Sequence, residues 1–179
     1  MKNIFKILIV ILLTLQTIVS CDNNDKTQKS VQIVDKKELE ELLIEANINM
    51  LSQESAIIDS FVNNKNLNVI KTGTGLRYYI EEAGEGDLIV KGNRVSLEYE
   101  VRFLNGKLVY SSDKDGIKTF VVGRGGVESG LEEAILFLRK NSVATIIIPS
   151  YLAHGLVGDG NRITQRATLV YKLKVIDIK

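Results

Sequence analysis

The hydrophobic pattern changes its period twice along the chain. Residues 7–15 are an almost unbroken apolar run, residues 39–61 carry apolar side chains at spacings of three, four and seven, and residues 76–80 and 95–103 alternate apolar with polar side chains. Spacings of three and four place side chains on one face of an α-helix, whereas alternation is typical of a half-buried β-strand. The pattern therefore predicts an apolar leader, one long helix and a domain that is mainly sheet.

The leader is typical of a secretory targeting segment. Two lysines precede the apolar run of residues 7–15, which is too short for a membrane-spanning helix. The run ends at residues 18–21 (IVSC), which resemble the site where bacterial lipoprotein signal peptidase cuts before a lipid-modified cysteine. An ordinary signal peptide with an incidental cysteine fits less well, because Cys21 is the only cysteine of the chain. We predict a lipoprotein signal peptide over residues 1–20, lipidation of Cys21 and a membrane-anchored, periplasm-facing place in the cell envelope.

A tether and a helix follow. Residues 21–34 are polar and lack an apolar period, which predicts a flexible tether. Residues 35–66 predict an amphipathic helix that begins at the capping pair Asp35 and Glu38 and ends near the polar residues 63–66. Such a helix has no core of its own, so either it covers the domain that follows, or it binds a partner or a second copy as a homodimer. Its apolar face is expected to consist of Leu39, Leu42, Leu43, Ala46, Met50, Ile57 and Phe61.

Residues 74–179 predict an α+β domain. Strands are favoured over residues 76–80 and 95–103, and the Asn-Gly pair at 105–106 favours a tight hairpin turn because both residue types tolerate positive φ angles. A helical pattern is found over residues 130–140. We expect an antiparallel sheet covered by one short helix, with a ligand groove between them. Further strands are expected over residues 119–122, 143–148 and 167–178.

Composition narrows the function. Lys and Arg number 23 and Asp and Glu 22, a balance that gives no electrostatic footprint for nucleic acid. A single cysteine excludes an intrachain disulfide, and a single histidine excludes a multi-histidine metal site. We expect no nucleic-acid partner, no metal and no cofactor.

Three other chemistries were weighed. His154 could join Ser111 or Ser112 in a hydrolase triad, but no Gly-x-Ser-x-Gly segment surrounds either serine, and a Ser-Ser pair after a hairpin strand is ordinary turn chemistry. Residues 113–116 (DKDG) resemble the start of a calcium loop, but apolar residues occupy the later ligand positions. Residues 123–126 (GRGG) precede a helix, as phosphate loops do, but lack the GxGxxG spacing and the strand–helix–strand context.

Six segments within residues 74–179 together resemble the FKBP family of peptidyl-prolyl isomerases. In chain order they are VSLEYEV, NGKLVYSS, TFVVG, VESGLEEAI, IIIPSYLAHG and ATLVYKLKVI. Each is weak alone, but their common order and spacing are specific. More narrowly, VESGLEE and LAHGLVGDGNRI resemble the gliding-motility-associated FKBP-type lipoproteins of Bacteroidetes. The resemblance implies an FKBP-like curved antiparallel β-sheet wrapped around one short α-helix and preceded by an N-terminal amphipathic helix.

The resemblance also implies a pocket between sheet and helix that accepts a substrate proline. Its apolar, aromatic lining would disfavour the planar, charge-separated form of the X–Pro bond, whose resonance creates a rotation barrier of about 18–20 kcal/mol. The backbone N–H of Glu128 would hold one substrate carbonyl and the side chain of His154 another. The residues expected to take part in catalysis are Tyr99, Tyr110, Glu128, His154 and Tyr171, and those expected to bind substrate are Val109, Phe120, Val127, Leu131 and Ile163.

Four positions depart from the family pattern. The family usually has Phe-Asp where this chain has Val109 and Tyr110, Tyr where it has His154, and Ile where it has Glu128. An imidazole can replace a phenol donor, but a tyrosine cannot imitate a carboxylate acceptor. We therefore expect a weak or narrow prolyl isomerase that assists the folding of proline-containing exported proteins in the cell envelope, with a role in gliding motility implied by the resemblance. The alternative is a catalytically weak FKBP-fold chaperone or protein-binding module.

Overall fold

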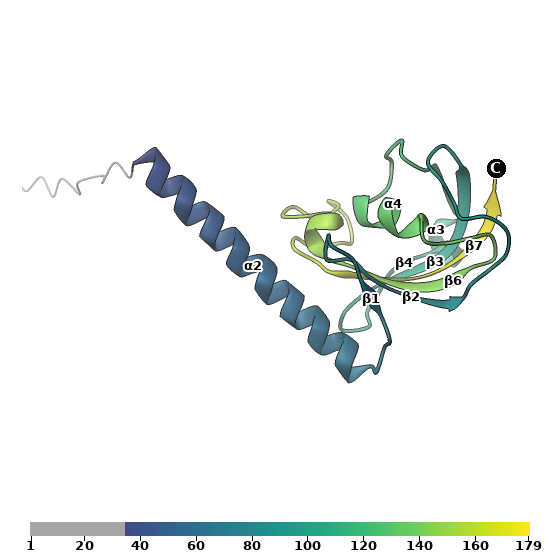
Figure 1. The fold of residues 1–179 in the computed structure, drawn as a ribbon, viewed down its shortest axis with the longest axis horizontal. Coiled ribbons are helices and arrows are strands. Elements are labelled where there is room, and N and C mark those ends of the chain that lie inside the picture. The colour runs from purple at the N-terminus through teal and green to yellow at the C-terminus, as the bar shows by residue number, and fades with distance from the viewer. Residues whose placement is uncertain (1–34) are drawn as a thin grey trace, which may run out of the picture. The chain divides into compact units, whose positions relative to one another are not determined.

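The computed structural model describes residues 35–179 of the chain (Figure 1). The predicted signal peptide, the predicted tether and Cys21 lie outside the described residues. Within residues 35–179, no helix is long and apolar enough to cross a membrane. Residues 40–179 form one compact unit, and the tertiary contacts described below all belong to it.

The described elements begin with the long helix, which four consecutive strands follow. The helices are α2 (Lys36–Asn64), α3 (Ser112–Asp115), α4 (Ser129–Ile135) and the short 3₁₀ helix η1 (Ser150–Leu152). The strands are β1 (Ile70–Lys71), β2 (Arg77–Glu82), β3 (Arg94–Phe103), β4 (Leu108–Ser111), β5 (Lys118–Val121), β6 (Val143–Ile148) and β7 (Leu169–Ile178).

All seven strands belong to one antiparallel sheet. They run in the order β1-β2-β6-β7-β3-β4, and β5 pairs with β3 beside the stretch that β4 occupies. The long strands β3 and β7 pair along most of their length. The inward face of β3 carries the buried residues Val95, Leu97, Tyr99 and Val101, as the period-two pattern predicts.

The predicted hairpin turn joins β3 to β4. Gly106 has a φ of 86°, and its N–H donates to the carbonyl of Phe103 at 2.9 Å. Asn105 Oδ1 accepts the N–H of Lys107 at 3.0 Å. The turn thus has the positive φ that favours glycine and the side-chain bond that favours asparagine.

Helix α4 covers the inner face of the sheet, which curves around it (Figure 1). Leu131, Ala134 and Ile135 are buried in the main hydrophobic core. Gly130 allows a close approach to β6, because a Cβ atom at this position would lie 2.4 Å from Ile148 Cγ2. A glycine here therefore fixes how closely the helix packs on the strand.

The helix predicted over residues 130–140 is shorter and ends at Ile135. Phe137 and Leu138 donate their N–H groups three residues back, each at 3.1 Å, so the chain tightens into a turn. Leu138 is still buried against the core, which explains why its apolar character extended the helical pattern past the true end.

Helix α2 is preceded by Asp35, whose Oδ1 accepts the N–H of Lys37 at 3.3 Å. Its buried residues are Ile58 and Val62, which form a second, smaller core with Ile147 on the outer face of the sheet. Helix α2 therefore covers the domain with its C-terminal turns, which supports one of the two interpretations for that part of the helix.

Most of the apolar face predicted for α2 is exposed in the structure. Leu42, Leu43 and Ile57 are 53%, 56% and 59% exposed, although Phe61 packs against the second core. The helix carries a second apolar row at helical spacing, and only its C-terminal members Ile58 and Val62 are buried in the described part of the chain. Periodicity alone cannot choose between two such rows. The second row is Ile44, Ile48, Leu51, Ile58 and Val62.

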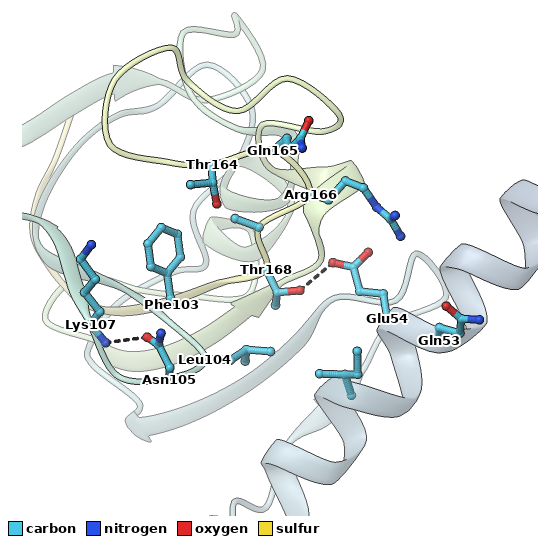
Figure 2. A pocket seen from close by; sticks show the side chains of 12 residues that line it. Gln53, Glu54, Phe103, Leu104, Asn105, Lys107, Thr164, Gln165, Arg166 and Thr168 are labelled. Carbon is cyan, nitrogen blue, oxygen red and sulfur yellow. Dashed lines mark hydrogen bonds between the residues drawn. The ribbon is translucent and has the colours of Figure 1, made fainter.

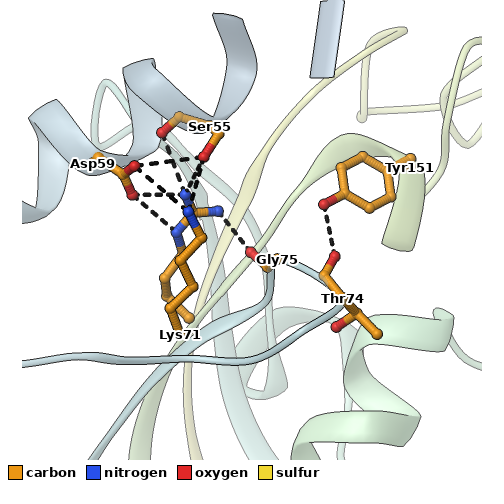
Figure 3. Close-up of polar contacts among 7 residues, drawn as sticks. Ser55, Asp59, Lys71, Thr74, Gly75 and Tyr151 are labelled. Atoms are coloured by element: carbon orange, nitrogen blue, oxygen red, sulfur yellow. Dashed lines mark hydrogen bonds and ion pairs between the residues drawn. The ribbon is translucent and has the colours of Figure 1, made fainter. Parts of the chain in front are cut away.

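A buried arginine holds α2 against the sheet. Arg77, the first residue of β2, is 1% exposed. Its guanidinium donates to Asp59 Oδ1 at 2.6 Å, to Ser55 Oγ at 2.7 Å and to the carbonyl of Gly75 at 2.6 Å, and Figure 3 shows these bonds. Because a buried guanidinium without partners costs several kcal/mol, these contacts position α2 as well as β2.

Glu54 makes a second polar contact between α2 and the domain. Its carboxylate accepts the N–H and the hydroxyl of Ser150 at 2.7 and 2.9 Å. The hydroxyl of Thr168 donates to the same carboxylate at 2.6 Å (Figure 2). The loop after β6 and the start of β7 are thereby fixed to one turn of the helix.

We predict that Asp59→Ala lowers the free energy of unfolding by about 2 kcal/mol, because Arg77 stays buried after losing its only charged partner. Urea denaturation at neutral pH measures the change. Glu45→Ala, at an exposed site of the same helix, is the control and is expected to change stability by less than about 0.5 kcal/mol. Equal effects of the two substitutions would contradict the role assigned to Arg77.

Candidate active site

The expected pocket residues come together where β3, β5 and β7 face the start of α4. Tyr99 and Tyr171 point inward from β3 and β7, and their ring centroids lie 6.3 Å apart at a tilt of 33°. Glu128 precedes the first residue of α4, and His154 follows η1. Alternation along the strands and the placement of α4 thus bring four of the five expected catalytic side chains into one cluster.

Glu128 is at the centre of this cluster. Its side chain is 6% exposed, and its Oε1 accepts the hydroxyl of Tyr171 at 2.7 Å and lies 3.1 Å from His154 Nε2. Its Oε2 has no hydrogen-bond partner, and the nearest opposite charge is Lys118 Nζ at 3.9 Å. The side chain that replaces the family's isoleucine is therefore a buried carboxylate with one oxygen still able to accept.

Burial raises the pKa of Glu128, but the charge of Lys118 and the hydrogen bond from Tyr171 outweigh it, so the pKa lies below its ordinary value. For Tyr171, burial and then the charge of Glu128 raise the pKa well above 10. The cluster therefore contains a carboxylate and a neutral phenol at neutral pH.

Lys118 is the member of the cluster that the sequence interpretation missed. Its Nζ lies 5.2 Å from the ring centroid of Tyr99 and 5.9 Å from that of Tyr171, so a cation covers the aromatic surface expected to receive the prolyl ring. Lys118 lies two residues before Phe120 on β5, and the strand period places both on the inward face. An inward-facing ammonium group is costly to bury unless an opposite charge lies nearby, and Glu128 supplies that charge.

A cavity of about 370 Å³ opens beside this pair, and its lining is more polar than expected. It is lined by Lys118, Gly126, Val127, Glu128, Ala153 and His154. An ion pair and an imidazole form much of its wall, whereas the resemblance implies an apolar, aromatic pocket.

The remaining expected substrate-binding residues lie deeper. Val109, Phe120 and Ile163 are buried in the main core, and Leu131 exposes none of its surface. Leu131 therefore does not form an open pocket floor, because it is enclosed in the same hydrophobic core as Tyr99 and Tyr171. Of this group, Val127 alone lines the cavity.

Tyr110 belongs to a neighbouring cluster. Its hydroxyl donates to the carboxylate of Asp159, and the guanidinium of Arg162 lies 4.6 Å from its ring centroid. Arg162 also pairs with Asp115 at 2.8 Å. Burial raises the pKa of Asp159, but the bonds from Tyr110 and from the N–H groups of Asn161 and Ile163 lower it to about 2. Tyr110 is therefore held by Asp159, which lies within the segment LAHGLVGDGNRI but was not among the expected site residues.

A larger cavity of about 680 Å³ lies elsewhere, between α2, the β3–β4 turn and residues 164–168 (Figure 2). Glu54 at its edge is already bonded to Thr168, as Figure 2 shows. No group of three or more His, Cys, Asp or Glu residues within residues 35–179 could hold a metal. The buried carboxylate, the ammonium group and the imidazole of the candidate site all lie at the cavity of about 370 Å³.

The chain matches the model of a family described as FKBP-type peptidyl-prolyl cis-trans isomerase over residues 86–176. The chain belongs to this family. The matched segment contains every residue of the Glu128 cluster and of the cavity beside it. The family expected from the six sequence segments is thereby confirmed.

Curated relatives agree with the family. The chain is 37% identical over 108 residues to the probable FKBP-type peptidyl-prolyl cis-trans isomerase FkpA of Neisseria meningitidis serogroup B, covering 60% of this chain and 39% of that protein. It is 32% identical over 118 residues to the peptidyl-prolyl cis-trans isomerase Mip of Coxiella burnetii, covering 65% of this chain and 50% of that protein. The chain thus spans half or less of the length of these relatives.

Solved structures of the family share the fold. The crystal structure of FkpA from Escherichia coli superposes with a TM-score of 0.60 at 24% identity, covering 82% of this chain and 74% of that one, a likeness that concerns the fold alone. AtFKBP13 superposes with a TM-score of 0.59 at 27% identity, covering 63% of this chain and 99% of that one. The expected FKBP-like sheet and helix are confirmed.

We predict that Tyr171→Phe lowers the free energy of unfolding by about 2 kcal/mol at pH 7, because Glu128 loses a donor to its charged form. The folded-state pKa of Glu128 is depressed, so this stabilisation is fully present above the unfolded pKa of about 4.3 and is lost progressively as the pH falls from there through the lower folded-state pKa. The difference between wild type and variant should therefore shrink at pH 3, as measured by urea denaturation at both pH values.

Tyr78→Phe is the control for this prediction, since Tyr78 stacks on Phe137 at a centroid distance of 4.7 Å and its ring contact survives the change. It should alter stability by less than about 0.5 kcal/mol at either pH. A Tyr171→Phe effect of the same size at pH 3 and pH 7 would show that the hydroxyl acts through packing and not through the charge of Glu128.

Proposed function

We propose that this chain is a peptidyl-prolyl cis-trans isomerase that assists the folding of exported proteins in the cell envelope. What supports the proposal is the cavity beside Glu128 and His154, which lies inside the segment that matches the family. Rotation about an X–Pro bond needs no nucleophile or metal, because the barrier of about 18–20 kcal/mol comes from resonance of the amide. A binding site that holds the peptide in a twisted geometry is sufficient.

The side chains at the cavity fit that task in part. Val127 and Ala153 supply apolar surface to the cavity, the rings of Tyr99 and Tyr171 lie beneath the ammonium of Lys118, and His154, whose side chain is 27% exposed, can reach a substrate carbonyl with a ring nitrogen. Lys118 covers both rings in the free protein, so a prolyl ring must displace its ammonium group. This competition supports the expectation that activity is weak or restricted to some substrates.

The envelope location is proposed from the sequence. Residues 18–21 end in Cys21, the proposed site of lipidation, and the apolar run before them is typical of a signal peptide. One relative at 30% identity, from Legionella longbeachae, is named outer membrane protein MIP. We also propose membership of the gliding-motility-associated FKBP-type lipoproteins of Bacteroidetes, on the wording LAHGLVGDGNRI at residues 152–163.

A second candidate function is a binding module, and the observation that favours it is the exposed apolar surface of α2. Leu42, Leu43, Ile44 and Ile48 are each more than half exposed in the described part of the chain. Exposed apolar rows of this extent are typical of association surfaces. We propose that this part of the helix pairs with a second copy to form a homodimer, or holds client polypeptides.

We expect the full-length protein, solubilised in non-ionic detergent, to accelerate cis–trans exchange of X-Pro peptides at micromolar concentration in a protease-free NMR exchange assay. His154→Ala should lower kcat/KM about three- to tenfold, because one hydrogen bond to a substrate carbonyl is lost. Leu156→Ala, at a 68% exposed position of the same loop, should leave kcat/KM unchanged. No acceleration above the uncatalysed rate would refute the isomerase and leave the binding module.

The dimer has its own test. Replacing both Leu42 and Leu43 by Ser should weaken self-association of residues 22–179 at least tenfold, measured by sedimentation velocity, because two apolar side chains no longer leave water. Glu45→Ala is the control. Point substitutions are preferable to deleting the helix, because deletion also removes Ser55 and Asp59, the partners of Arg77. An unchanged sedimentation coefficient would exclude this face as the dimer interface.

A further inference from the structure

The cluster at the candidate active site already binds a cation. The Lys118 ammonium lies over the faces of two tyrosine rings and 3.9 Å from a buried carboxylate. Lys118 is 25% exposed by its side chain, and Tyr171 is 1% exposed, so the group is largely withdrawn from water. Aromatic faces and a carboxylate are the groups that hold ammonium and guanidinium ions in proteins.

The carboxylate of this site has capacity for another donor. Glu128 Oε1 bonds to Tyr171 and contacts His154, whereas Oε2 is the buried side-chain oxygen within residues 35–179 that lacks a hydrogen bond. A buried acceptor that receives no hydrogen bond destabilises the folded protein relative to one that does. Glu128 and Lys118 both line the open cavity, and a ligand that displaces the Lys118 ammonium from its place 3.9 Å away would approach this oxygen.

A plain prolyl ring meets a conflict at this site. To stack on Tyr99 and Tyr171 it must displace the ammonium of Lys118, and Glu128 is then left buried without its nearest opposite charge. A substrate that carries its own cation removes the conflict, because its charge takes the place of the one displaced. The displaced lysine side chain can extend into the cavity that it already lines.

We propose that Tyr99, Tyr171 and Glu128 form a cation-binding subsite, occupied by Lys118 in the free protein, and that the pocket selects prolyl peptides with a lysine or arginine next to the proline. The proposal deepens the proposed isomerase function and rests on it for its substrate. Glu128 is the specificity-determining residue, and Lys118 is an internal competitor.

Three capped peptides that differ only before the proline test the subsite: acetyl-Ala-Lys-Pro-Phe-amide and its Leu and Glu counterparts. Their binding to the full-length protein in non-ionic detergent is measured by NMR titration at low and at physiological salt. We expect the Lys peptide to bind about tenfold more tightly than the Leu peptide, and the Glu peptide to bind most weakly. Equal affinities of the Lys and Leu peptides would overturn the proposal.

Two substitutions separate the subsite from general charge attraction. Glu128→Gln should reduce the Lys-over-Leu preference to less than twofold, and Lys118→Met should tighten binding of the Lys peptide about tenfold by removing the competitor. Lys114→Met, which removes an exposed lysine of α3, controls for net charge and should leave all three affinities unchanged. If Lys118→Met and Lys114→Met increased the affinity for the Lys peptide by similar factors, the proposal would be overturned. If circular dichroism shows that Glu128→Gln does not fold, the comparison of Lys118→Met with Lys114→Met decides.

The exchange rates of the same peptides distinguish this proposal from the proposed function. Preferential binding of the Lys peptide without accelerated cis–trans exchange keeps the cation subsite and refutes the isomerase. Equal binding and equal acceleration of the Lys and Leu peptides keeps the isomerase and overturns the subsite.

Discussion

Burying a carboxylate costs several kcal/mol unless donors and opposite charges compensate, and Glu128 is buried at the point where a prolyl isomerase would be expected to be apolar. The compensation comes from three directions: the hydroxyl of Tyr171 on β7, the ring of His154 after η1 and the ammonium of Lys118 on β5. Each of these side chains is oriented by the carboxylate it serves. The charge of one residue thus determines what covers the aromatic rings, what lines the cavity and what a ligand must displace.

A buried charge is also compensated by hydrogen bonds and an opposite charge at the other face of the sheet. Arg77 is buried beneath α2, and its donors are taken by Ser55, Asp59 and the carbonyl of Gly75. Glu54 bonds to the loop after β6 one turn earlier. The helix is therefore attached to the domain by directional polar contacts around a small apolar core, and its N-terminal turns are left with exposed apolar side chains. A helix of this kind can pack on the domain with its C-terminal turns and bind a partner with its N-terminal turns.

The fold was predictable because its signals are local and repeated. Alternation marks β3, the Asn-Gly pair marks its hairpin, and the order of six segments identifies the family. The burial of α2 was not predictable, because the helix carries two apolar rows and the choice between them depends on Arg77 and Ile147, which are distant in sequence.

The polar character of the site was missed for a related reason. The sequence interpretation assigned a role to the backbone N–H of Glu128 but none to its carboxylate, and it passed over Lys118, since each looks like an exposed charge on its own. Period two on β5 places Lys118 inward with Phe120, and only the pairing of β5 with β3 shows that this face meets the start of α4. The pattern of polar and apolar residues does not reveal two charges that compensate each other inside a core, because it shows which residues are polar and not which of them pair in space.

An ion pair in the pocket also links binding to catalysis. A polar lining stabilises the planar, charge-separated form of the X–Pro bond, and so it works against the twisted state that an apolar lining favours. With Lys118 in place, the rings of Tyr99 and Tyr171 are covered and the pocket has this unfavourable character. A substrate cation that replaces the ammonium against Glu128 keeps the carboxylate compensated while freeing ring surface for the proline. Recognition of the residue beside the proline and exposure of the apolar surface that twists the bond then become one event, so a pocket that is poor for proline alone can be effective for a particular class of prolyl peptide.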